Sequence, residues 1–119
     1  MRAANLLDRE GAKVMIQVSI LYLNTPDSRF DIDYYLNQHM PKTIRLLSPA
    51  LRGVTVDQGI SGATPDQTPT YAAGCHLRFD SADAFYSAFV PHAEKLQADI
   101  PNYTDVAPVI QISEIRISR

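Results

Sequence analysis

The sequence predicts an α+β domain with the ferredoxin-like βαββαβ order, in which two helices cover one face of a four-stranded antiparallel sheet. The first observation is that apolar residues repeat at a spacing of two in some segments and of three and four in others. The second is an internal similarity, because the segment RFDIDYYLNQHMP follows the first predicted strand and the similar segment RFDSADAFYSAFVP follows the third. Each segment joins a strand end, a helix cap and a helix that contains proline, and a short hairpin between the halves favours this fold.

The first half of the chain supplies a strand, a helix and a second strand. Apolar residues alternate over residues 14–23, which predicts the first strand. Turn residues follow, and Asp31 is well placed to cap a helix over residues 32–47. The alternation of LRGVTVDQGI predicts the second strand over residues 51–60, and the Gly, Pro and Asp content of residues 61–70 is typical of an exposed loop.

The second half repeats this order. The segment TYAAGCHLRF alternates again and predicts the third strand over residues 70–79. Ser81 is placed to cap a second helix that continues beyond Pro91 to Leu96. The segment PVIQISEIRIS predicts the last strand over residues 108–118.

The face of the sheet without helices predicts a homodimer. On the first strand it carries Met15, Gln17, Ser19, Leu21 and Leu23. This mixture is too apolar to be left in water and too polar for the core of one chain. A second copy of the sheet would cover it by two-fold symmetry, and we therefore expect a dimeric α+β barrel.

The last predicted strand changes its apolar face midway. Ile110 and Ile112 would lie on one face of a regular strand, whereas Ile115 and Ile117 would lie on the opposite face. Either a bulge or a passage from one sheet to a neighbouring sheet would produce this change. We favour the passage to a partner, because it would close the open edges of two facing sheets.

Composition limits the class of protein. A chain of 119 residues with 45% hydrophobic residues fits one domain, residues 14–119, after a polar N-terminal extension, residues 1–13. The 11 basic and 13 acidic residues are scattered, so we expect neither nucleic acid nor membrane as a partner. No apolar run approaches the roughly 20 residues that span a bilayer, the opening lacks a signal peptide core, and the single Cys75 excludes an internal disulfide. These features predict a cytoplasmic protein.

His39 is the main candidate for chemistry. It lies in a helical stripe formed by Ile32, Leu36, His39, Thr43 and Leu46. Tyr35 is one turn earlier, and Pro41 should kink or loosen the helix because it crowds the carbonyl of Asn37. One interpretation is packing, with His39 donating to that carbonyl. The other is a general acid or base in a small cavity, with Tyr35 orienting it or donating to an oxyanion.

Other side chains are weaker candidates. Tyr22 and Phe79 end strands on the helix side and are predicted to line a substrate pocket near His39, although core residues would look the same. His76 lies on the helix-free face, where a ligand contact is an alternative to the structural hydrogen bond that we favour. Cys75 is interpreted as a buried, inert thiol.

No metal or other cofactor is expected. The histidines at positions 39, 76 and 92 share no short ligand spacing, and His92 is interpreted as a surface or capping residue. The glycines fall in strands and a polar loop, so none opens a helix as a phosphate-binding loop does.

The segments MIQVSILYLNTP, RFDIDYYLNQHMPK and PHAEKLQADIPNYT resemble the EthD family of dimeric α+β-barrel proteins. The most specific element is the Tyr-x3-His-x-Pro pattern of Tyr35, His39 and Pro41, and the resemblance runs from Met15 to about Ile115. It implies a ferredoxin-like dimer and a family linked to the degradation of ethers and other xenobiotics. Distant barrel relatives cyclise polyketides, isomerise lactones or oxygenate aromatic compounds.

Two classes of function follow. The first is a cofactor-independent enzyme of catabolic or secondary metabolism that acts on a small hydrophobic or aromatic compound by acid-base chemistry at His39. The second is a non-catalytic binding or accessory protein that sequesters the compound or delivers it to a partner enzyme. A closed pocket at which His39 and another polar group converge would favour the enzyme.

Overall fold

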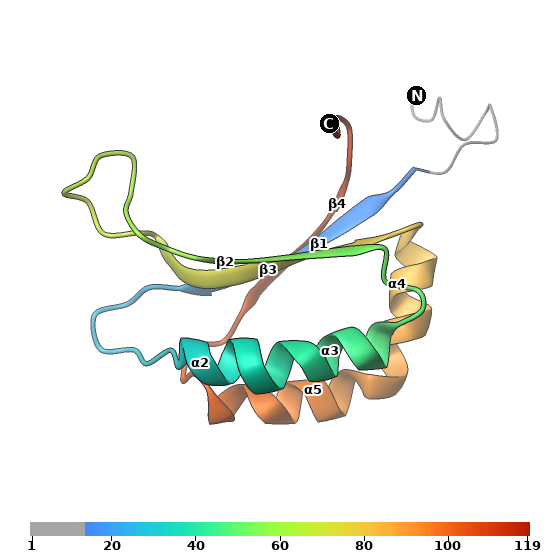
Figure 1. The fold of residues 1–119 in the computed structure, drawn as a ribbon, viewed down its shortest axis with the longest axis horizontal. Coiled ribbons are helices and arrows are strands. Elements are labelled where there is room, and N and C mark those ends of the chain that lie inside the picture. The colour runs from blue at the N-terminus through green and yellow to red at the C-terminus, as the bar shows by residue number, and fades with distance from the viewer. Residues whose placement is uncertain (1–13) are drawn as a thin grey trace.

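The four strands form one antiparallel sheet in the order β2-β3-β1-β4, as the ferredoxin-like topology requires (Figure 1). The computed structural model describes residues 14–119, and the predicted N-terminal extension, residues 1–13, lies outside them. The strands are β1 (Ile16–Leu23), β2 (Gly53–Gln58), β3 (Tyr71–Phe79) and β4 (Val109–Glu114). The helices are α2 (Ile32–Tyr34), α3 (Met40–Leu47), α4 (Ala82–Phe89) and α5 (Ala93–Asp99). The predicted fold class is confirmed.

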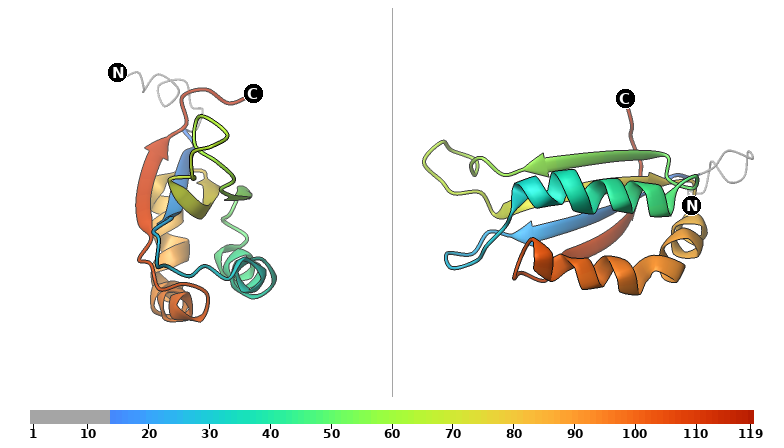
Figure 2. Two further views of the ribbon diagram at one scale, coloured as in Figure 1. Left: turned by 90° about the vertical axis from the view of Figure 1, so that its left-hand side faces the viewer. Right: turned by 60° about the horizontal axis from the view of Figure 1, so that its bottom comes forward.

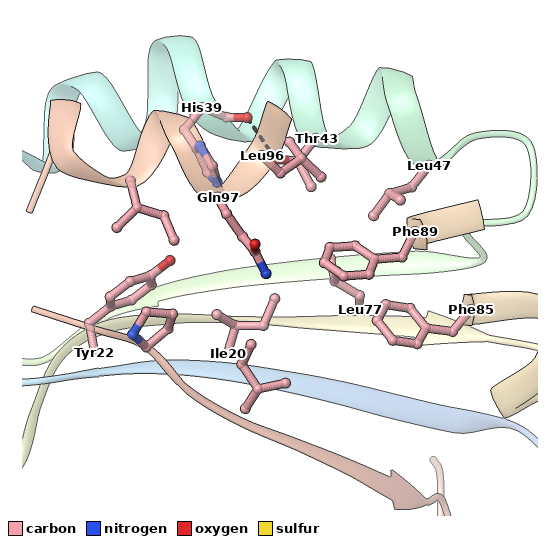
Figure 3. Close-up of a pocket in the computed structure, with 13 residues that line it drawn as sticks. Ile20, Tyr22, His39, Thr43, Leu47, Leu77, Phe85, Phe89, Leu96 and Gln97 are labelled. Carbon is pink, nitrogen blue, oxygen red and sulfur yellow. Dashed lines mark hydrogen bonds between the residues drawn. The ribbon is translucent and has the colours of Figure 1, made fainter. Parts of the chain in front are cut away.

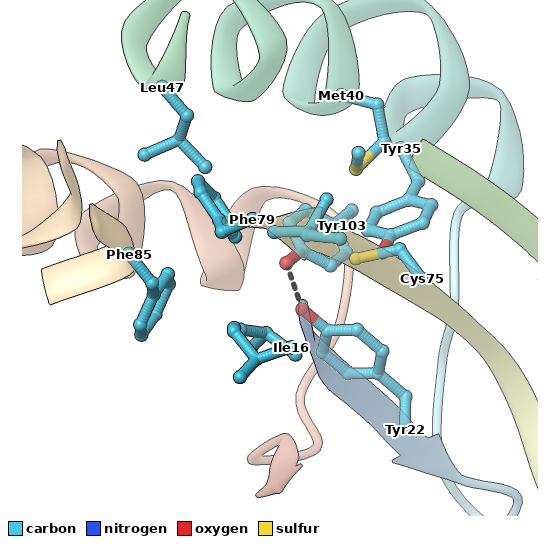
Figure 4. Packing of buried hydrophobic residues seen from close by; sticks show 11 residues of the cluster. Ile16, Tyr22, Tyr35, Met40, Leu47, Cys75, Phe79, Phe85 and Tyr103 are labelled. Carbon is cyan, nitrogen blue, oxygen red and sulfur yellow. Dashed lines mark hydrogen bonds between the residues drawn. The ribbon is translucent and has the colours of Figure 1, made fainter. Parts of the chain in front are cut away.

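All helices cover the same face of the sheet (Figure 2). The helix made of α2 and α3 and the helix α5 lie side by side under the sheet, while α4 closes one end (Figures 1 and 2). Between these layers, β1 contributes Val18 and Tyr22, and β3 contributes Leu77 and Phe79. Figure 4 shows Tyr22 and Phe79 in this core. Each fully buried side chain of this size stabilises the fold by about 1.5–3 kcal/mol, so the core is strongest where the central strands meet the helices.

A π-helical turn, Tyr35–His39, joins α2 to α3. The backbone N–H of Met40 bonds to the carbonyl of Tyr35, five residues earlier. Pro41 explains this widening, because it has no N–H to donate and its ring crowds the preceding turn. The loosened helix expected beside His39 is confirmed, and π turns of this kind are frequent at functional sites.

The buried face of this helix differs from the predicted stripe. Its buried residues are Tyr35, His39, Met40, Thr43 and Leu47. Leu36, which the regular spacing assigned to the sheet side, is 46% exposed. The extra residue in the π turn shifts the phase of the helix, so that Tyr35 rather than Leu36 contacts the sheet.

The second predicted helix is divided at Pro91 into α4, a single 3-10 turn (Val90–His92) and α5. Ser81 caps its start as expected, since its hydroxyl accepts from the N–H of Ala84 at 3.0 Å. A further 3-10 turn, Ile100–Asn102, follows α5 and returns the chain to the start of the first helix.

That return is held by backbone contacts. The N–H of Asp31 donates to the carbonyl of Tyr103 at 2.7 Å, and Phe30 and Thr104 form an isolated β-bridge. The hydroxyl of Thr104 donates to the carbonyl of Arg29 at 2.6 Å. These contacts fix residues 99–104 against the π turn, which is where the candidate site lies.

The last strand is shorter than predicted. It pairs with β1 in unbroken register from Val109 to Glu114, so the change of apolar face does not arise from a bulge inside β4. Ile115 makes one more hydrogen bond, to the carbonyl of Met15, and residues 115–119 form no strand. The tail leads away from the helices, with Ile117 75% exposed (Figure 1).

Within residues 14–119, none of the helices combines the length and the apolar composition that crossing a membrane would require.

Candidate functional site

A cavity of about 340 Å³ lies between the helix-covered face of the sheet and helices α3, α4 and α5 (Figure 3). This volume is at the small end of the roughly 300–1,000 Å³ typical of ligand sites. Polar groups reach it from His39, Tyr22, Thr43 and Gln97. The rest of the lining is apolar and comes from Ile20, Leu47, Leu77, Phe85, Phe89, Leu96, Ile100, Pro108 and Ile110.

His39 points from its helix into this cavity (Figure 3). Its Nδ1 lies 2.8 Å from Oδ2 of Asp99, at the end of α5, and both residues are buried. Its Nε2 lies 3.5 Å from the hydroxyl of Tyr103. The ring nitrogens are therefore engaged by Asp99 and Tyr103, rather than by the backbone carbonyl that the packing interpretation of His39 assigned to them.

Asp99 is surrounded by donors. Its Oδ1 accepts from the hydroxyl of Tyr34 at 2.7 Å and from the side-chain amide of Asn102 at 2.9 Å. Its Oδ2 accepts from His39 and lies 3.4 Å from Nζ of Lys42. Burial acts to raise the pKa of Asp99, but these donors together hold that pKa well below its usual range, so the carboxyl group is ionised.

An ionised Asp99 determines the tautomer of His39. A carboxylate only accepts hydrogen bonds, so Nδ1 of His39 carries the proton in this pair. Burial lowers the pKa of His39, and the hydrogen bond and charge of Asp99 offset only part of that effect. The imidazole is therefore neutral at pH 7, with a lone pair on Nε2 that faces the hydroxyl of Tyr103.

Two tyrosines extend this arrangement. The hydroxyl of Tyr103 lies 2.5 Å from the hydroxyl of Tyr22, which lines the cavity (Figure 4). Burial raises the pKa of Tyr22 to about 12 and raises that of Tyr103 further, so both hydroxyls stay protonated at neutral pH. A continuous contact therefore leads from Asp99 through His39 and Tyr103 to the cavity wall.

The comparisons with known proteins agree with the resemblance noted in the sequence. Residues 27–107, more than half of the chain, match the family model of the EthD domain. The chain belongs to the EthD family. An EthD-like protein from Ralstonia eutropha JMP134 is 40% identical to it, with a TM-score of 0.85 and coverage of 90% of this chain and 96% of that one.

Other structures share the fold of this EthD-family chain. A protein of the ethyl tert-butyl ether D (EthD) family from Bacillus halodurans C-125 is 19% identical, with a TM-score of 0.60 and coverage of 85% and 98% of the two chains. A cofactor-independent oxygenase from Streptomyces nogalater is 16% identical, with a TM-score of 0.52 and coverage of 90% and 97%. At such identities the likeness shows the fold alone. A comparison with curated proteins gives no match.

Tyr35 of the EthD-family motif stacks on His39, with ring centroids 5.6 Å apart and planes inclined by 12°. Its hydroxyl is buried without a well-formed hydrogen bond and faces the thiol of Cys75, which is at best a weak partner. Burial is the main cause that raises the pKa of the Tyr35 hydroxyl. Burial also raises the pKa of the Cys75 thiol, to about 11. Tyr35 thus contacts His39 through its ring, and it is not among the residues that line the cavity.

The other predicted site residues are dispersed. Tyr22 lines the cavity, whereas Phe79 is buried in the core and does not line it. His76 is on the opposite face of the sheet, 2.9 Å from the hydroxyl of Ser19 and 3.5 Å from a carboxylate oxygen of Asp57. The described residues contain no group of three or more His, Cys, Asp or Glu side chains that could hold a metal ion.

Asp99 and Tyr103 were not identified from the sequence. One signal was present, because Asp99 follows Leu96 by three residues and therefore shares its buried helix face. A carboxylate on such a face needs hydrogen-bond or charged partners, so its position alone marks Asp99 as a candidate. Tyr103 carried no comparable signal, since it follows α5 in an irregular segment.

Proposed function

We propose that this EthD-family protein is a cofactor-independent enzyme that removes a proton from a small hydrophobic compound, with Nε2 of His39 as the general base. The observation that carries the proposal is the Asp99 to His39 contact of 2.8 Å behind a mainly apolar cavity. A buried carboxylate on Nδ1 leaves Nε2 unprotonated and stabilises the imidazolium that forms when a proton is taken up.

The mechanism uses only side chains of this chain. A bound molecule contacts the apolar walls, and its acidic proton moves to Nε2 of His39 while Asp99 remains ionised. The proton is then returned from the imidazolium to the product, so the base is regenerated. Asp99 is a positioning residue in this scheme, and the ring of Tyr35, stacked at 5.6 Å, orients the imidazole.

We also propose that the protein acts as a homodimer. The helix-free face of β1 carries the polar Gln17 and Ser19 beside Leu21 and Leu23, and the latter is partly exposed. Such a face is too apolar to be left in water and too polar for the core of one chain, so a second copy would cover it by two-fold symmetry. His76 lies in this face, where its hydrogen bond to Ser19 supports the structural role.

A probe of proton abstraction tests the proposed base. The compound 5-nitrobenzisoxazole is small and apolar, and it opens to a coloured phenolate when a base removes its C–H proton. We expect the protein to accelerate this reaction and His39→Gln to lower the rate by about 10²- to 10⁴-fold. His92→Gln is the matched control, since His92 does not line the cavity. Equal rates for the wild type and His39→Gln would overturn the proposal.

The binding or accessory role remains a second candidate because the cavity lining is mainly apolar, which suits retention of a hydrophobic metabolite without chemistry. Under that role the protein binds apolar probes, and neither the wild type nor His39→Gln accelerates proton transfer. The same experiment therefore separates the two functions.

A further inference from the structure

We propose that Tyr22 and Tyr103 form a proton relay from the cavity to His39, and that the cavity selects small apolar molecules with an acidic hydroxyl group, such as activated phenols and enols. This inference rests on the proposed role of His39 as the base. It adds the class of ligand and the path by which the proton travels.

In the proposed relay the hydrogen bonds run in one direction, which is assigned by starting from Asp99. Because Nδ1 of His39 donates to Asp99, Nε2 has no hydrogen and accepts. The hydroxyl of Tyr103, 3.5 Å away, therefore donates to Nε2. The oxygen of Tyr103 then accepts from the hydroxyl of Tyr22 at 2.5 Å. The hydroxyl protons of Tyr22 and Tyr103 thus both point toward His39.

Tyr22 is the member of the proposed relay that contacts the ligand. It lines the cavity, whereas Tyr103 is 0% exposed and lies behind it. Since the hydrogen of Tyr22 is committed to Tyr103, its oxygen presents only lone pairs to the cavity. An acceptor in a mainly apolar wall favours a ligand with a donor at that point, because an apolar ligand would leave the oxygen unsatisfied.

The proton transfer balances without a further reactant. The ligand O–H bond breaks and its proton moves to the oxygen of Tyr22. Tyr22 passes its own proton to Tyr103, and Tyr103 passes its proton to Nε2 of His39. The products are a ligand oxyanion in the cavity and an imidazolium paired with Asp99. Both tyrosines are unchanged at the end, in keeping with their raised pKa values, which disfavour a free tyrosinate.

The pKa of His39 limits how weakly acidic the ligand hydroxyl group can be. The pKa of His39 lies below the usual value of about 6.5, whereas an ordinary phenol ionises at about 10. Transfer from an ordinary phenol is therefore uphill by more than three pKa units. Phenols and enols acidified by electron-withdrawing groups are closer to the acidity of His39, and these form the expected class.

The test compares 4-nitrophenol, an acidic phenol with a coloured anion, with 4-nitroanisole, which has the same ring but no O–H group. We expect the wild type to bind 4-nitrophenol at least tenfold more tightly than 4-nitroanisole, and the phenolate absorbance of the bound ligand should appear at a lower pH than that of the free phenol. Tyr22→Phe and Tyr103→Phe should each abolish the preference, whereas Tyr71→Phe, a tyrosine outside the cavity, should keep it. Thermal unfolding checks each variant, and Tyr22→Phe decides alone if Tyr103→Phe does not fold.

The relay is overturned if the wild type shows no preference, or if Tyr22→Phe retains it. Neither result touches the proposed base, because 5-nitrobenzisoxazole has no hydroxyl group and reports on His39 separately. Loss of the preference together with ring opening that still depends on His39 in Tyr22→Phe is the pattern that supports the relay.

Discussion

Nδ1 of His39 and Oδ2 of Asp99 are 2.8 Å apart, although 60 positions separate the two residues in the chain. The contact joins the π turn of the first helix to the end of α5, and it assigns the proton to Nδ1. The ring nitrogen that remains, Nε2, is then the acceptor beside the cavity. The proposed chemistry depends on this contact.

Asp99→Asn should therefore lower proton transfer by at least tenfold while leaving the protein folded, because an amide has no charge with which to stabilise the imidazolium. Since Asp99 acts to raise the pKa of His39, the variant should also shift the acid limb of the pH-rate profile to lower pH. Rates with 5-nitrobenzisoxazole over a pH series measure both effects. Asp83→Asn, in the first turn of α4, is the control. An unchanged profile would remove Asp99 from the positioning role.

His39→Ala should abolish or sharply lower turnover on an identified substrate and leave the oligomer folded. Asp99 retains Tyr34, Asn102 and Lys42 as partners in this variant, so the carboxylate is not left unpaired. Circular dichroism and sedimentation check the fold. A variant that unfolds, or one with full activity, would return His39 to packing.

The pH dependence follows from the lowered pKa of His39, whose main cause is burial. The base form is the neutral ring, so the midpoint of the acid limb of the pH-rate profile should lie below pH 6.5. A pH-rate profile with its acid midpoint above pH 7 would contradict this expectation.

Stability should change in the same range. The unfolded chain protonates His39 at about pH 6.5, before the folded chain does, so the free energy of unfolding falls as the pH drops below that value. The carboxyl of Asp99 adds a second loss below about pH 3.9, because its folded pKa lies under the unfolded value. Denaturant unfolding of the wild type and His39→Gln, compared between pH 7 and pH 5, isolates the first contribution.

Ile110→Trp should block the cavity. Ile110 lines it from β4 and is 53% exposed, so a larger side chain there can occupy the opening without compressing the core. We expect apolar probes to bind at least tenfold more weakly and the free energy of unfolding to change by about 0.5 kcal/mol or less. Titration calorimetry and denaturant unfolding measure the two quantities. Unchanged binding would mean that ligands do not enter beside β4.

Truncation after Ser113 tests the predicted dimer and the role of the last residues. It removes Glu114 and the tail, residues 115–119, which forms no strand within its own chain. We expect the truncation to weaken the dimer more than the monomer fold, because the tail is predicted to pair with the partner sheet. Sedimentation at nanomolar concentration measures this. A truncated protein that stays dimeric would show that the tail does not pair with the edge of the partner sheet.

The element order was predictable because strands and helices carry different hydrophobic periods, and because Asp31 and Ser81 mark the helix starts. The buried face of the first helix was not predictable, since the π turn adds a residue that a regular spacing of three and four does not include. Leu36 was therefore assigned to the buried face and Tyr35 was not.

The site was predictable only in part, for a related reason. His39 and Tyr22 could be placed from local patterns, because His39 falls on the predicted apolar stripe of the first helix and Tyr22 on the apolar face of the first strand. Asp99 and Tyr103 reach His39 through the tertiary return of residues 99–104, which no local period encodes. Phe79 has the pattern of a pocket residue and of a core residue alike, and only the packing distinguishes them.

The tautomer of His39, on which the proposed base depends, can be measured without a substrate. Nitrogen-15 NMR of the imidazole at pH 7 distinguishes a protonated ring nitrogen from a bare one, and His39→Gln assigns the signals. We expect a neutral ring with the proton on Nδ1, a bare Nε2, and a titration midpoint below pH 6.5. A ring that carries its proton on Nε2, or an imidazolium at pH 7, would contradict the proposed base.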